Sequence, residues 1–313
     1  MNNMKKITKE DLCHGDVLLF TPHGKDWIAR AIAFLTDGQV HHAALCYYED
    51  IEKDDKCVME SLLNKGLVIN YLKEKEERTF PAYVARLKKD ITLEPVLKAA
   101  QSFYAKESHY PNANLVMLSI LLLTRKFSRF SIEQAVFYDF LCLVSALLMD
   151  FMRQHGNESS MICSQFVAQC FTDSGKDYEL DFEHLVIFDV RLKSDEKDNC
   201  VSLLEYMDTA NIDIQSHVLS GCELENPEEI FQQFKNIVQK VPNTNDNAEY
   251  QGAIVSVTSE IKRIINEFCL HEFGVSFSPE NFSTLRNYLV TPQDLYANTS
   301  SLEIIGELNY LDA

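Results

Sequence analysis

Short apolar blocks recur through residues 15–90, and polar turns rich in Gly, Asn and charged side chains separate them. Blocks of this length with such turns favour strands joined by hairpins. We expect these strands to form one antiparallel meander, with a short helix at 26–35 after the first strand. The expected strands are Gly15–Phe20, Val40–Tyr48, Cys57–Leu62, Leu67–Leu72 and Tyr83–Leu87.

The spacing of apolar residues becomes helical after residue 90. It predicts helices at 93–105, 115–123 and 132–152, and a shorter one that begins near Cys163. The segments 115–123 and 132–152 are strongly apolar, but the first is too short for a membrane span and the second carries acidic residues. We expect them to form a buried helix pair. The alternative is an amphipathic pair that offers a groove to a lipid or acyl chain.

The helix near Cys163 carries an unusual combination of features. Apolar side chains follow Cys163 at i+3, i+4 and i+7, and Ser159 or Ser160 is expected to cap the helix start. Cys163 would then lie in the first turn, where the helix dipole favours the nucleophilic thiolate. On this pattern alone Cys163 also fits a buried core residue, because free cysteine is among the most buried types. Cys170, on the same face, is expected to pack in the core.

A nucleophilic cysteine needs a base within hydrogen-bond reach, and the base needs an orienting partner. His42 lies at the start of the second expected strand, and Glu60 lies in the third. A hairpin would bring these two positions to the same region of the sheet edge, where a carboxylate raises the basicity of an imidazole. Taken singly, His42 also fits an ordinary histidine of an edge strand, and Glu60 an exposed strand carboxylate.

Composition and charge narrow the class of protein. The chain has 313 residues, of which 46% are hydrophobic and 24% charged, as is usual for a soluble globular protein. Its formal net charge of −18 argues against nucleic acid or an anionic membrane surface as a non-specific partner. Residues 201–313 hold 5 Lys and Arg against 17 Asp and Glu, so most of the acidic excess lies in the last third.

The nine cysteines include no CxxC pair, which indicates a reduced set rather than a disulfide framework or a zinc site. No apolar run follows Lys5 and Lys6, so we expect no secretory signal peptide. The expected location is therefore the cytoplasm, or a compartment reached by a secretion route that needs no signal peptide.

Histidines are frequent near the N-terminus and raise the question of a metal site. The spacing of His14, His23, His41 and His42 is not that of a closed zinc site, and no cysteine pair joins them. The glycines of this region form neither a dinucleotide-binding fingerprint nor a phosphate-binding loop. We therefore expect no metal and no cofactor.

Several short motifs follow one another in a characteristic order. A Gly-Asp pair precedes the first strand, a His-x-x-aliphatic motif opens the second, a Glu lies in the third before a Gly-aliphatic strand, and a Cys-Ser-x-Phe-Val helix comes much later. The segments that carry these motifs, with the fifth strand, are 15–20, 42–45, 58–61 with 66–68, 83–87 and 162–167. In this order they resemble the circularly permuted NlpC-type papain-like hydrolases, which include the YiiX-like bacterial proteins and have lecithin retinol acyltransferase as a distant relative.

The resemblance implies an α+β papain-like fold, in which an antiparallel meander sheet packs on helices. It implies that Cys163 is the nucleophile, that His42 is the base and that Glu60 orients His42. His41 is one register off the motif and is expected to face away from the site.

The segment Leu289–Leu295 resembles the closing segment of YiiX-like domains, which packs back on the catalytic unit. The resemblance therefore implies a permuted papain-like core at 12–175, an acidic and mostly helical insertion or cap at 176–286, and a C-terminal segment at 287–313 that packs on the core. The insertion lies outside the resemblance and could serve as a lid or as a surface for a protein partner.

Three functions fit these expectations. The first is a thiol hydrolase that acts on an amide or ester in a peptide, an isopeptide or a lipid through a Cys163 acyl-enzyme. The second is an acyltransferase or phospholipase-like enzyme that uses the same acyl-enzyme on a lipid donor, with transient contact to a membrane or acyl chain. The third is an acidic adaptor with a relic site, which requires no contact between Cys163 and His42.

Overall fold

The computed structural model describes residues 4–22, 27–48, 56–62, 65–72, 81–105, 161–182 and 286–308, together with Leu118, Leu122, Leu185, Asn266 and Leu270. Chain contacts divide the protein into two units. The first comprises Met1–Pro111, Glu158–Val186 and Arg286–Ala313, and the second comprises Asn112–Asn157 and Ile187–Leu285. The continuous described stretches all belong to the first unit.

Several expectations concern segments of which the structure describes only a few positions. These are the helices at 115–123 and 132–152 and nearly all of the insertion at 176–286. The domain boundaries therefore stay a prediction. No helix among the described residues is long and apolar enough to cross a membrane.

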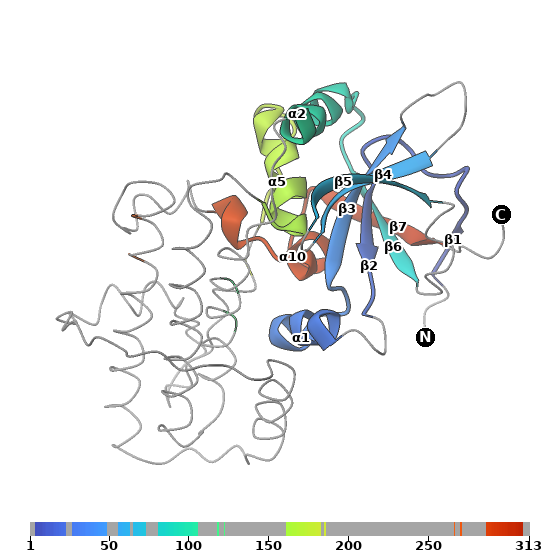
Figure 1. The fold of residues 1–313 in the computed structure, drawn as a ribbon. Coiled ribbons are helices and arrows are strands. Elements are labelled where there is room, and N and C mark those ends of the chain that lie inside the picture. Colours follow the sequence, from blue (N-terminus) through green and yellow to red (C-terminus); the bar gives the residue numbers. More distant parts are fainter. Residues whose placement is uncertain are drawn as a thin grey trace, which may run out of the picture. The chain divides into compact units, whose positions relative to one another are not determined.

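The described part is a mixed α+β fold built on a seven-stranded sheet (Figure 1). The strand order is β1-β7-β6-β2-β3-β4-β5; β1 is parallel to β7, and all other neighbours are antiparallel. The strands are β1 (Lys6–Ile7), β2 (Val17–Phe20), β3 (His42–Tyr48), β4 (Lys56–Leu62), β5 (Gly66–Tyr71), β6 (Ala82–Leu87) and β7 (Leu302–Leu308). The helices are α1 (Trp27–Thr36), α2 (Glu94–Ala105), α5 (Cys163–Asp173), η5 (Arg286–Leu289) and α10 (Pro292–Ala297).

The expectation of one meander is wrong for its last strand. Strands β2 to β5 do pair in chain order, but β6 pairs with β2 instead of β5. Strand β2 is buried at all four positions, so it favours a central place with partners on both edges. The apolar spacing of the chain predicts the strands but does not say which edge a later strand will join.

The sheet has apolar packing on both of its faces. One face carries a buried cluster that includes Leu18 and Phe20 of β2 and Ala44 of β3. Helix α5 contacts β3, β4 and α2, and its Phe166 and Phe171 are fully buried. The start of α5 is thereby placed beside the strands that carry His42 and Glu60.

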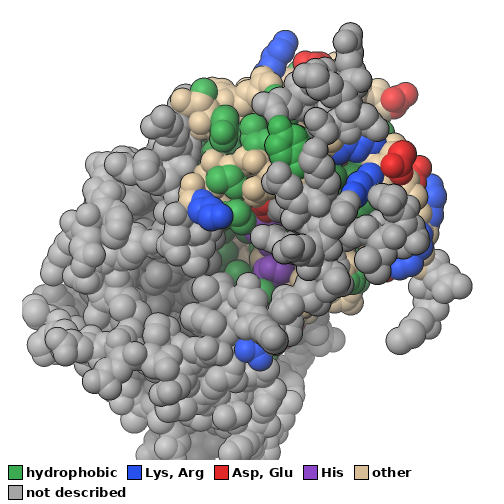
Figure 2. All heavy atoms as spheres, turned by 45° about the vertical axis from the view of Figure 1, so that its right-hand side comes forward, with side chains coloured by type: hydrophobic (Ala, Val, Ile, Leu, Met, Phe, Trp, Pro, Cys, Tyr) green, Lys and Arg blue, Asp and Glu red, His purple; other side chains and the backbone are tan. Residues whose placement is uncertain are grey.

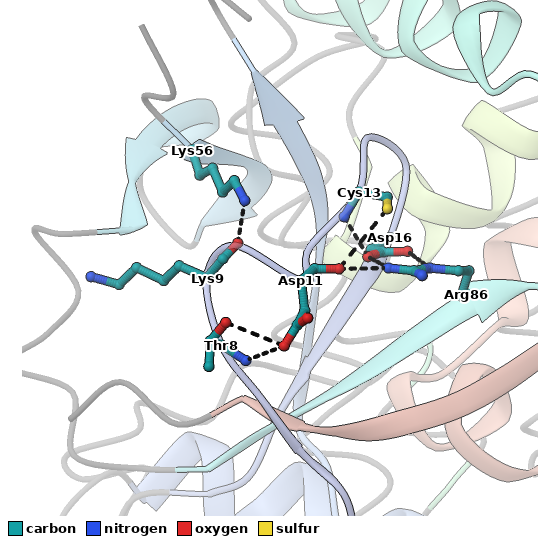
Figure 3. A network of polar contacts seen from close by, with 7 residues as sticks. All are labelled: Thr8, Lys9, Asp11, Cys13, Asp16, Lys56 and Arg86. Atoms are coloured by element: carbon teal, nitrogen blue, oxygen red, sulfur yellow. Dashed lines mark hydrogen bonds and ion pairs between the residues drawn. The ribbon is translucent and has the colours of Figure 1, made fainter. Parts of the chain in front are cut away.

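A polar network holds the turn before β2 (Figure 3). Arg86 of β6 donates from Nε and Nη2 to the two carboxylate oxygens of Asp16, each at 2.7 Å. The Cys13 amide donates to Oδ2 of Asp16 at 2.8 Å, and Arg86 Nη2 also donates to the Asp11 carbonyl at 2.9 Å. The hydrogen bonds to the fully buried Asp16 raise the pKa of Arg86, so this bidentate ion pair joins β6 to the β2 turn.

We predict that Gly15→Ala destabilises the fold more than Gly175→Ala. Both glycines have positive φ, 79° and 104°, which costs an alanine about 1–2 kcal/mol. A Cβ at Gly15 would also lie 2.5 Å from Leu93 Cδ1 and 3.0 Å from Leu93 Cβ, whereas a Cβ at Gly175 meets nothing within 4 Å. Overpacking of this kind adds about 1–3 kcal/mol. Urea unfolding of the two variants measures the difference, and equal losses would contradict the packing argument.

Candidate active site

The structure brings together the three side chains that the sequence singled out. His42 is the first residue of β3, Glu60 lies in β4, and Cys163 is the first residue of α5. The side chains of Cys163 and His42 are hydrogen-bonded to each other. His42 Nε2 lies 2.6 Å from Glu60 Oε2, so Nδ1 is the ring nitrogen that remains for the cysteine. The three residues form one continuous row from the helix to the third strand of the meander.

Strand register explains the contact between His42 and Glu60. Leu45 of β3 lies opposite Met59 of β4, which places Ala44 opposite Glu60. His42 is two residues from Ala44 and therefore shares a face of the sheet with Glu60 at a diagonal position, within reach of long side chains.

The same register logic adds a residue that sequence reasoning missed. Glu60 lies opposite Val68 of β5, and Asn70 is two residues further on the same face. Asn70 Nδ2 donates to Glu60 Oε1 at 2.7 Å. The hairpin pairs Leu62 with Gly66, so a register read from the Asn-Lys-Gly turn would have placed Asn70 diagonally across from Glu60. Glu60 therefore meets His42 with one oxygen and Asn70 with the other.

The start of α5 differs from the expectation of a serine cap. The N-cap residue is Ile162, whose side chain makes no capping hydrogen bond, and Ser159 and Ser160 lie outside the described residues. The Ile162 amide donates instead to Oε1 of Gln165 at 3.3 Å. The predicted serine cap is wrong because the helix begins at Cys163 itself, so that Ile162 holds the N-cap position.

Two serine hydroxyls fasten the helix start to its surroundings. Ser61 Oγ of β4 donates to the Met161 carbonyl at 2.6 Å, and Ser164 Oγ donates to the Val290 carbonyl at 2.7 Å. Ser61 and Ser164 are both buried. Cys163 thus lies between two anchored positions of the backbone.

Burial and neighbouring charges shift the pKa of His42 in opposite directions. Its side chain is 12% exposed, and the side chain of Glu60 is fully buried. Burial alone would lower the pKa of His42, but the charge and hydrogen bond of Cys163, followed by those of Glu60, raise it to about 9. An imidazole in this site is therefore protonated at neutral pH.

Cys163 shows the complementary shift. Burial would raise its pKa, but the charge and hydrogen bond of His42 outweigh burial and lower it. Hydrogen bonds from the backbone amides of Ala43 and Ser164 lower it further. Between the lowered pKa of Cys163 and a pH of about 9, the two residues form a thiolate–imidazolium pair, which is the reactive form of a cysteine nucleophile.

Neighbouring candidates have different surroundings. Cys170 lies two turns further along α5, is fully buried, and burial raises its pKa well above the ordinary value, as suits a core residue. His41 Nδ1 lies 3.0 Å from the Phe20 carbonyl, which can only accept, so His41 donates to the backbone. His41 therefore bonds to a strand and is not part of the row through Glu60.

No group of three residues that could hold a metal ion occurs among the described residues. Of the four histidines weighed as ligands, His23 lies outside them. In the space-filling view, histidine side chains reach the surface beside hydrophobic side chains (Figure 2).

No protein-family model matches this chain, and no curated protein is significantly similar to it.

We predict that Cys163→Ala lowers the pKa of His42 from about 9, because Cys163 makes the largest contributions that raise it. An NMR titration of the imidazole signals measures this shift. Cys170→Ala is the matched control, since Cys170 lies on the same helix and does not contribute to the pKa of His42. An unchanged titration in Cys163→Ala would contradict the coupling of the two side chains.

Proposed function

We propose that this protein is a cysteine hydrolase of the circularly permuted, NlpC-type papain-like class, which cleaves an amide or ester through an acyl-enzyme on Cys163. The observation that carries the proposal is the hydrogen-bonded row Cys163–His42–Glu60, which starts at the first residue of a helix. The chain order supports the permuted class, since the strands that bear His42 and Glu60 precede the helix that bears Cys163.

The row supplies each group that acyl transfer requires. The Cys163 thiolate attacks the carbonyl carbon of the substrate and forms a C–S bond, and the carbonyl π electrons move to oxygen. The His42 imidazolium then donates its proton to the leaving amine or alcohol as the C–N or C–O bond breaks. Water attacks the thioester while neutral His42 takes its proton, and the acid leaves as the Cys163 thiolate is restored.

Glu60 suits the orienting role on geometric and electrostatic grounds. Its carboxylate accepts from Nε2 of His42 and so directs Nδ1 toward Cys163. A buried carboxylate also stabilises the imidazolium, which must persist until the proton is transferred. The hydrogen bond between Cys163 and His42 argues against an adaptor with a relic site, because that function needs no such contact.

Acyl transfer to a second acceptor begins with the same acyl-enzyme. The sequence places the alternative acyl-chain groove in the helices at 115–123 and 132–152. These segments lie almost entirely outside the described residues. No described side chain favours that route over water, so hydrolysis is the function proposed, and transfer is an outcome that the experiments below distinguish.

We predict that iodoacetamide alkylates Cys163 rapidly at pH 6. The lowered pKa of Cys163 keeps it a thiolate at a pH where ordinary thiols are protonated. His42→Ala removes the imidazolium and should slow the reaction at least about tenfold at this pH. Peptide mapping by mass spectrometry assigns the modified residue, and a Cys13→Ser background removes an exposed thiol. Equal labelling of Cys163 and the buried Cys170 would contradict an activated thiolate.

We predict that p-nitrophenyl esters or peptide thioesters load an acyl group onto Cys163, visible as a mass increase of the intact protein. Cys163→Ala should abolish the increase, because the nucleophilic sulfur is lost. Decay of the adduct in water alone indicates hydrolysis, whereas decay that requires an added amine or alcohol indicates transfer. A wild-type protein that never acquires an acyl group from any ester, thioester or peptide would contradict the proposed function.

We predict a bell-shaped pH dependence of kcat/KM. Activity should fall at low pH as the thiolate is protonated, and at high pH as His42 loses its proton near pH 9. Glu60→Gln keeps the shape but removes the negative charge, so the upper limb should move to lower pH and kcat/KM should fall roughly ten- to a hundredfold. An upper limb that does not move in Glu60→Gln would contradict the role of Glu60.

A further inference from the structure

Asn70 places a hydrogen-bond donor against the buried carboxylate of Glu60. Its Nδ2 lies 2.7 Å from Glu60 Oε1, while the other oxygen of Glu60 lies 2.6 Å from His42 Nε2. An ionised carboxylate accepts hydrogen bonds but cannot donate them, so the amide nitrogen must face it. Asn70 is half-buried in β5, whereas Glu60 is fully buried in β4.

Buried carboxylates keep their charge only where donors replace the water they have lost. In the part of the chain that the structure describes, Glu60 has donors on two different strands, His42 on β3 and Asn70 on β5. The two bonds to the two oxygens also fix the plane of the carboxylate, which sets the direction of its bond to His42.

We propose that Asn70 is a positioning residue that acts through Glu60 to keep the Cys163–His42 pair ionised. This inference rests on the proposed function for its catalytic consequence, but its physical content concerns the protonation of the row. Loss of the Asn70 donor destabilises the charged carboxylate of Glu60, so the proton on His42 shifts toward Glu60. This shift is a transfer within the pair, and the total number of protons stays the same. Without the imidazolium, the Cys163 thiolate loses its largest stabilising charge.

Among the described residues, the charged and titratable neighbours of His42 come from α5, from β4 and from the position before β3. His42 is influenced by Cys163 of α5 and Glu60 of β4, and the ring of His41 lies 6.1 Å from the ring of His42. Asn70 cannot titrate, so its replacement changes hydrogen bonding without adding or removing a charge.

The test replaces Asn70 by Leu, which has similar size and no donor. Iodoacetamide alkylation of Cys163 should become about tenfold slower at pH 6, the effect expected for losing one hydrogen bond to a charged group. The pH at which the alkylation rate of Cys163 reaches half its maximum should rise. The pKa of His42, measured by NMR titration, should be lower than in the wild-type protein. Asn70→Gln keeps an amide donor and should recover most of the alkylation rate.

Two further variants serve as a control for the position of the substitution and as a replacement if Asn70→Leu does not fold. Ile69→Val alters the neighbouring residue, which points to the opposite face of β5, and should leave both titrations unchanged. If Asn70→Leu fails to fold, Asn70→Val takes its place, because a β-branched side chain favours a strand and also lacks a donor.

The result that overturns the proposal is a folded Asn70→Leu or Asn70→Val variant, less stable in urea, with the titrations of Cys163 and His42 unchanged. Asn70 would then have a structural role only. Shifted titrations in a protein that forms no acyl-enzyme would uphold the positioning role and refute the proposed hydrolase. The two failures are therefore distinguishable.

Discussion

The start of helix α5 is held by hydrogen bonds on both sides of Cys163, one to the sheet and one to the segment before α10. Ser61 reaches the Met161 carbonyl from β4, and Ser164 reaches the Val290 carbonyl near the C-terminus. These contacts join residues 100 and 126 positions apart in the chain. In the proposed hydrolase, a nucleophile and its base must keep their separation within a fraction of an ångström, so the row through His42 would depend on this anchoring.

The segment around α10 also reaches the other side of the site. Gln293 Oε1 accepts from the Gln39 amide at 3.0 Å, in the loop that leads into His42. The segment is itself stiffened at Thr291, whose amide and hydroxyl donate to the buried carboxylate of Asp294 at 2.8 and 2.6 Å. One short stretch therefore contacts both the helix that carries Cys163 and the loop that leads into His42.

Two fully buried carboxylates in this fold have opposite consequences. Asp16 pairs with Arg86, whose guanidinium stays charged at every physiological pH, and the pair joins β6 to the β2 turn. Glu60 pairs with His42, whose proton can leave, and receives its second donor from the neutral amide of Asn70. The partner of a buried carboxylate therefore decides whether the pair has a fixed charge, as with Arg86, or one that can change with pH, as with His42.

Local patterns along the chain were enough to predict β2 to β5 and the helices α1 and α2, because apolar spacing and turn residues act over a few neighbouring positions. The three residues of the row were singled out by the hairpin expected between the strands of His42 and Glu60 and by the family resemblance. Local patterns did not predict the pairing of β6 with β2, since strand pairing depends on which edge remains open once the first strands are assembled. They did predict a helix that begins near Cys163, but they predicted neither Asn70 nor Ile162 as its N-cap. Asn70 meets Glu60 only through hairpin register, and the hydrogen bonds of the α5 start to Ser61 and Val290 join residues that no local pattern connects to Cys163.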